Sequence, residues 1–272
     1  MKTELEALRL IEDREERYNS ALKLFQAMRQ DAARRVDAEI EKKGIAYVSV
    51  EEIIGYTRGG LHRTIQRDFN LKPLALSRLA YQLLSRSCHE VLFGFSAVTE
   101  LPKLESDLVR QFLSGSEKRK NEAFTCIMKL YQEDKRDGTL YSPTDGELVC
   151  ERVQTLCEDR NVQPMYLLGN EECHSVKINL RKITFQQTPP YTPRNAMLMY
   201  LAWSLNTSLD YFTAPDYTEF TDLRCFGARE TELVKDPLIK SILGKFLLLS
   251  EASRARFVSH LLNASWNSCV PA

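Results

Sequence analysis

Apolar residues recur at steps of three and four along most of the chain, and this spacing predicts a protein built of helices. Between Glu4 and Lys43 the spacing continues without a glycine or proline, which indicates one long amphipathic helix or two abutting ones, ended by Gly44. Alternation of apolar and polar residues, which is typical of half-buried strands, is almost absent. We therefore expect an all-α fold without a sizeable sheet.

A compact series of short helices is predicted after Gly44. The pattern indicates a helix over "SVEEIIGY" with Ser49 as its N-cap, followed by a turn at "TRGG". A second helix is expected from Leu61 to Phe69. Pro73 marks a break, and a third helix is expected from Leu74 to Leu84.

The order of these elements occurs twice. Both "LAYQLLSRSCHEVLFG" (79–94) and "LAWSLNTSLDYF" (201–212) read as an apolar helix, a small polar residue, an acidic residue and two bulky apolar residues. Later in each half, "LVRQFLSGSEKRKNEAFTCIMKL" and "ILGKFLLLSEASRARFVSHLL" align without gaps as helical pairs, so that Ser116, a predicted N-cap, aligns with Ser250. We interpret the chain as a tandem duplication, with the polar segment Glu133–Glu147 as its linker.

These stretches resemble lambda-repressor-like helix-turn-helix regulators of the xenobiotic-response-element type. The ending "LAWSLNTSLDYF" carries most of the likeness, because domains of that family end in an apolar helix, a short turn and a Ser-Leu-Asp cap before two hydrophobic residues. The first copy is similar through "KKGIAYVSVEEIIGYTRGGLHRTIQRD". The likeness covers roughly 33–94 and 150–214.

The resemblance implies two tandem helix-turn-helix units, each followed by a helical pair. We expect an N-terminal amphipathic helix over 1–32, unit one over 33–94, a helical pair and linker over 95–140, unit two over 141–214, and a C-terminal helical segment over 215–272.

Proteins of this family read DNA with one helix in the major groove, so the resemblance implies a recognition helix in each unit. Residues 58–78 contain five Lys or Arg and one acidic residue, and residues 174–194 contain four and none. The polar side chains turned outward on these helices are the predicted DNA-binding residues: Arg58, His62, Arg63, Gln66 and Arg67 in unit one, and His174, Lys177, Arg181 and Lys182 in unit two.

The overall charge does not by itself point to a partner. Lys plus Arg equals Asp plus Glu at 37 each, so any attraction to nucleic acid must be local. Seven scattered cysteines without a C-x-x-C pair argue against a disulfide framework or zinc site, and indicate a reducing cytoplasm. The longest apolar run, "ILGKFLLL", is too short to span a bilayer, so we expect no membrane association.

No catalytic motif stands out. The four histidines show no metal-binding spacing, and neither a phosphate-binding loop nor a nucleophile elbow is present. We expect no enzymatic activity, cofactor or metal. The leading hypothesis is a transcriptional regulator, such as a repressor, that binds double-stranded DNA sequence-specifically as a monomer or homodimer. The alternative is a protein-interaction module whose basic faces bind an acidic protein or inhibit a nucleic-acid-processing nuclease of a host.

Overall fold

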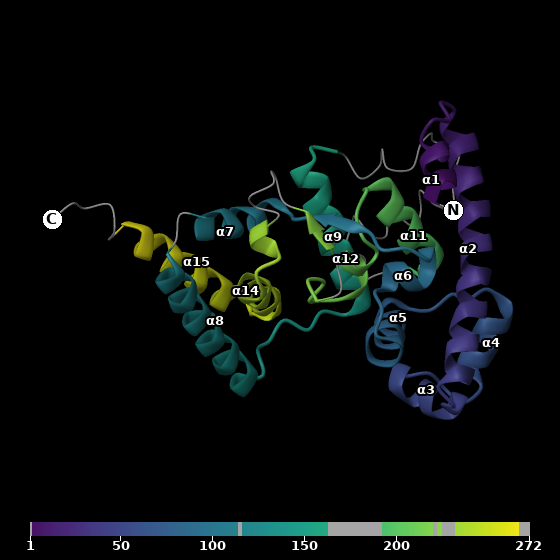
Figure 1. The fold of residues 1–272 in the computed structure, drawn as a ribbon, viewed down its shortest axis with the longest axis horizontal. Coiled ribbons are helices and arrows are strands. Elements are labelled where there is room, and N and C mark those ends of the chain that lie inside the picture. The colour runs from purple at the N-terminus through teal and green to yellow at the C-terminus, as the bar shows by residue number, and fades with distance from the viewer. Residues whose placement is uncertain (1, 114–115, 163–191, 220–221, 225–231, 267–272) are drawn as a thin grey trace. The chain divides into compact units, whose positions relative to one another are not determined.

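A computed structural model describes residues 2–113, 116–162, 192–219, 222–224 and 232–266. Helices dominate these residues (Figure 1), and their only strands are β1 (Val98–Glu100) and β2 (Asp222–Arg224), which pair in one small sheet. The predicted all-α character is therefore confirmed.

The chain folds as two compact units, called unit 1 and unit 2 from here on, whose bounds differ from those of the predicted helix-turn-helix units one and two. Each compact unit combines segments that are far apart in sequence. Unit 1 comprises Met1–Thr99, Pro143–Ala214 and Phe220–Asp222. Unit 2 comprises Glu100–Ser142, Pro215–Glu219 and Leu223–Ala272. Neither unit is thus a continuous stretch of chain.

The N-terminal periodic segment forms two helices in unit 1, α1 (Lys2–Leu8) and the long α2 (Arg14–Lys42). The break between them has a local cause, because the Asp13 side chain accepts a 2.7 Å hydrogen bond from the backbone N–H of Glu16 and so caps α2. Gly44 follows α2 with φ +64, in the left-handed region that glycine adopts at little cost.

Four short helices and a π-helical segment follow in unit 1: α3 (Tyr47–Ile54), α4 (Gly60–Arg67), α5 (Pro73–Arg78), η1 (Leu79–Leu84) and α6 (Cys88–Phe93). The predicted N-cap Ser49 is wrong, because α3 already begins after Ala46 and places Ser49 within its first turn. The helix predicted to reach Phe69 ends at Arg67, because Phe69 has a φ of +46.

Three further helices complete the described part of unit 1: α9 (Asp145–Asp159), α11 (Asn195–Ser204) and α12 (Asp210–Thr213). Thr144 and Glu147 form a reciprocal capping box at the start of α9. The linker predicted over Glu133–Glu147 is therefore too long, because helices occupy both of its ends.

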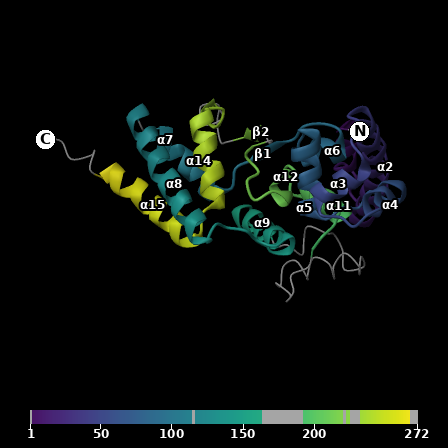
Figure 2. The ribbon, with the colours of Figure 1, turned by 90° about the horizontal axis from the view of Figure 1, so that it is seen from below.

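Unit 2 contains the two predicted helical pairs. The first is α7 (Lys103–Leu113) with α8 (Glu117–Asp137), and the second is α14 (Pro237–Leu248) with α15 (Glu251–Trp266). Helix α8 packs against both α14 and α15 (Figure 2). Its buried residues Ile127 and Leu130 contribute to a core that also includes Phe246 and Phe257, all at most 4 % exposed.

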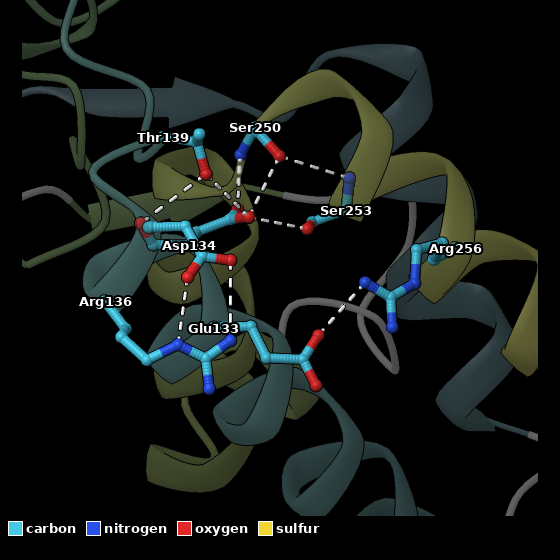
Figure 3. Close-up of polar contacts among 8 residues, drawn as sticks. Glu133, Asp134, Arg136, Thr139, Ser250, Ser253 and Arg256 are labelled. Carbon is cyan, nitrogen blue, oxygen red and sulfur yellow. Dashed lines mark hydrogen bonds and ion pairs between the residues drawn. The ribbon is translucent and has the colours of Figure 1, made fainter.

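Asp134 of α8 binds the start of α15 (Figure 3). Its carboxylate accepts hydrogen bonds from the backbone N–H of Ser250 at 2.8 Å and from the Ser253 hydroxyl at 2.8 Å. The hydroxyls of Ser250 and Thr139 add bonds of 3.1 Å each. Burial on its own would raise the pKa of Asp134, but these donors outweigh it and the pKa is lowered. A carboxylate of the first pair thus caps a helix of the second.

Candidate nucleic-acid interface

Glu51 of α3 fixes the start of α4. Its side chain is only 2 % exposed, and its two carboxylate oxygens accept hydrogen bonds of 2.8 Å from the backbone N–H groups of Gly59 and Leu61. Gly59 has a φ of +74, a backbone conformation that is strained for any residue with an L side chain. Charge-assisted bonds to a helix N-terminus are strong, so Glu51 sets the position of α4 relative to α3.

The far end of α4 is held by two other helices. Phe69 is fully buried, and its carbonyl accepts a 2.8 Å bond from the Asn195 side-chain amide of α11. The guanidinium of Arg29 in α2 donates to the carbonyl of Asp68 at 3.1 Å. Since Leu61 is also fully buried, α4 has an anchored inner side and an outer side that is left exposed.

The five DNA-binding residues predicted for the helix-turn-helix unit over 33–94 lie on or beside this outer side. Arg58 precedes α4, the other four belong to it, and all five are exposed: Arg58, His62, Arg63, Gln66 and Arg67. Ile65, which shares a helix face with the buried Leu61, is half-buried. The structure therefore brings these polar residues together around one short helix.

Three of the five side chains interact within α4 and its approach. The Nε of Arg63 donates to the carbonyl of Gly59 at 2.9 Å. The Nε2 atoms of Gln66 and His62 are 3.1 Å apart, and the His62 ring meets Tyr47 edge to face at a centroid distance of 5.4 Å. The guanidiniums of Arg58 and Arg67, by contrast, form no hydrogen bond or ion pair with any other described residue.

The DNA-binding residues predicted for the second helix-turn-helix unit, over 141–214, are His174, Lys177, Arg181 and Lys182. All four lie outside the described residues, within 163–191. The structure therefore gives a candidate surface only for the predicted helix-turn-helix unit over 33–94.

Sequence reasoning missed the residues that hold α4 in place. Glu51 and Glu52 are adjacent glutamates, yet the first is buried and the second is exposed. Asn195 reaches α4 from 126 positions away, a distance over which no helical spacing carries information. A glutamate at a position next to the apolar residues Val50 and Ile54 is the one local signal that could have suggested burial.

The two repeated motifs meet in a buried polar cluster around Asp210. The Asp210 carboxylate accepts hydrogen bonds from the backbone N–H groups of Cys88 at 2.6 Å and His89 at 3.2 Å. The hydroxyls of Tyr81 and Ser208 also donate to it, at 2.6 and 2.7 Å. Burial raises the pKa of both Cys88 and Tyr81. Because Asp210 is 0 % exposed, we assign this cluster a structural role.

The described residues contain no group of three or more His, Cys, Asp or Glu placed to hold a metal ion. Cys88, Cys126, Cys150 and Cys157 are free thiols. No helix in the described part of the chain is long and apolar enough to cross a bilayer.

No protein-family model matches the chain, and neither the curated proteins nor the solved structures contain a match.

Proposed function

We propose that the protein is a transcriptional regulator that binds double-stranded DNA sequence-specifically, with α3 and α4 as a helix-turn-helix and α4 as the recognition helix. The observation that supports this most strongly is the bond of Glu51 to the start of α4. It holds a short helix rigidly from its inner side, while the outer side presents basic and amide side chains to solvent.

The exposed residues have the chemistry that base and phosphate recognition needs. Arginine pairs bidentately with the O6 and N7 atoms of guanine, and glutamine with the N6 and N7 atoms of adenine. Exposed arginines without a partner among the described residues, such as Arg58 and Arg67, are suited to phosphate contacts that set the register of a protein on the duplex. Asp68 is the one exposed acidic residue between 58 and 78, so the local charge favours DNA.

The basic segment 174–194 belongs to the same proposal. If it supplies a second recognition helix, the two helices differ in sequence, and one chain would bind an asymmetric site rather than a palindrome.

The test is a selection from a randomised duplex pool with the full chain, followed by anisotropy titrations at about 50 and 200 mM salt. We expect an enriched sequence and an affinity that falls steeply with salt, because phosphate contacts release counterions. Replacing both Arg58 and Arg67 by alanine removes two such contacts and lowers the salt slope by about 2.

The matched control is Arg136→Ala together with Lys118→Ala. Both residues are exposed cations of unit 2, with side chains 73 % and 85 % exposed, so the control removes the same charge from residues that do not belong to α4. An equal loss in the control would point to non-specific attraction. Failure of the wild-type chain to bind any duplex at 50 mM salt contradicts the proposal and leaves the protein-interaction hypothesis.

A further inference from the structure

We propose that His62 determines the base preference of α4, because it fixes the amide of Gln66 in the orientation that selects adenine. This inference rests on the proposed DNA-binding function and names the base that one residue of the site recognises.

The hydrogen bond between the two side chains assigns the roles of their atoms. The Nε2 of Gln66 lies 3.1 Å from the Nε2 of His62, one helical turn away. An amide nitrogen can donate but cannot accept, so the imidazole nitrogen must be the acceptor. In this arrangement the Nε2 atom of His62 accepts the bond and Nδ1 carries the ring proton.

The imidazole itself is held by residues of two other helices. Its ring packs against Tyr47 of α3 at an interplanar angle of 89°. The Tyr47 hydroxyl in turn donates to the carboxylate of Asp37 in α2. A chain of contacts thus runs from α2 through α3 to the exposed side of α4, and it ends at the amide of Gln66.

This orientation leaves Gln66 with one pattern to offer a ligand. One N–H is used by His62, so the side-chain oxygen and the second N–H are free. Adenine presents an N6–H donor and the N7 acceptor in the major groove, and the free atoms of Gln66 match both. The reversed amide would turn its oxygen to residue 62 and present N–H donors outward, which suits the O6 and N7 acceptors of guanine.

The experiment is a randomised-duplex selection with sequencing, carried out on the wild type and on Gln66→Ala, His62→Lys, His62→Gln and His62→Ala. We expect one position of the wild-type site to prefer adenine by about 5- to 100-fold. Gln66→Ala removes this preference. His62→Lys, which can only donate, also removes it and enriches guanine at that position.

His62→Gln supplies the rescue, because its side-chain oxygen can accept the same N–H and the adenine preference is retained. Since residue 62 is exposed, these variants fold, and circular dichroism checks that they do. A loss of adenine preference on His62→Ala gives a second, independent confirmation.

The outcomes separate the two proposals. A wild type that selects a sequence, but keeps the same base at every position in His62→Lys and His62→Ala, overturns the role of His62 and leaves DNA binding standing. A wild type that selects no sequence and shows no salt-dependent binding overturns both.

Discussion

At the scale of single residues, His89 shows how the core of unit 1 depends on a neutral imidazole. The side chain is 6 % exposed and stacks on Phe93 at a ring distance of 4.2 Å. Its Nδ1 atom accepts a 3.2 Å bond from the backbone N–H of Leu209. Burial lowers the pKa of His89 to about 3, and only the charge of Glu90 opposes this.

The low pKa of His89 predicts an acid-sensitive fold. The unfolded chain takes up a proton near the ordinary value of 6.5, whereas the folded chain does so only near 3. The stability from this residue is therefore fully present above pH 6.5 and is lost as the pH falls towards 3. We expect a loss of about 1 kcal/mol in the free energy of unfolding between pH 7 and pH 5.5, measured by urea denaturation.

The variant His89→Asn isolates this effect. Its amide oxygen can accept the N–H of Leu209, but it does not titrate, so the pH dependence over the same interval should flatten even if the variant is less stable overall. The same slope in both proteins would show that other groups cause the acid sensitivity.

At the scale of elements, the short helices of unit 1 are fixed by long-range bonds as much as by their own caps. The N-terminus of α4 is bound by Glu51, and that of α6 by both its local Ser87–Glu90 capping box and the distant Asp210. Of these contacts, the local sequence reveals only the capping box. A capping box is visible in sequence as a serine followed three positions later by a glutamate.

This difference explains how much of the fold the sequence could predict. The long N-terminal helical segment, its stop at Gly44 and the helical pairs follow from periodicity and glycine. The misplaced N-cap at Ser49 shows the limit, because serine is the one favoured N-cap type in "AYVSV", yet α3 begins after Ala46 without a side-chain cap. The outward residues of α4 could be inferred, whereas its anchors Asn195 and Arg29 could not, since they depend on tertiary contacts.

Helix α14 provides a prediction about close packing. Gly244 is buried within it, and an added Cβ would lie 2.5 Å from the Oδ2 atom of Asp216. That carboxylate cannot easily move, because the backbone N–H and hydroxyl of Thr218 bond to its Oδ1 at 2.9 and 2.6 Å. Alanine is normally the better helix residue by about 1 kcal/mol, yet we expect Gly244→Ala to destabilise unit 2 by about 1–3 kcal/mol.

Chemical denaturation measures this change, with Ser241→Ala as the control in the same helix. Ser241 is half-buried, and its replacement by alanine should be close to neutral or slightly stabilising. A Gly244→Ala protein that is more stable than the wild type would show that Asp216 yields at little cost.

At the scale of the whole molecule, the two units have separate cores although their segments alternate along the chain. The side chains of Phe25 in unit 1 and Phe257 in unit 2 are each at most 1 % exposed. The sequence repeat could suggest two modules, but it could not show that segments from both halves combine within each unit. That arrangement depends on contacts such as those of Asp134 and Asp210, which join residues more than 100 positions apart.

Separate cores predict separate responses to core substitutions. Phe257→Ala should cost about 3–5 kcal/mol and accelerate hydrogen–deuterium exchange in peptides of unit 2. Phe25→Ala is the reciprocal variant and should accelerate exchange in peptides of unit 1. If either substitution raised exchange equally in both units, the chain would unfold as one cooperative body instead.

The alternating segments also impose an order on folding during synthesis. As the chain leaves the ribosome, residues 1–99 emerge first but cannot complete their unit until Asp210 has followed. At roughly 5–20 residues per second, this wait lasts on the order of ten seconds. During that interval α6 lacks its distant carboxylate, and α8 waits still longer for α14 and α15. We therefore expect the nascent chain to expose the apolar faces of both unfinished units at once, a condition that favours the binding of chaperones.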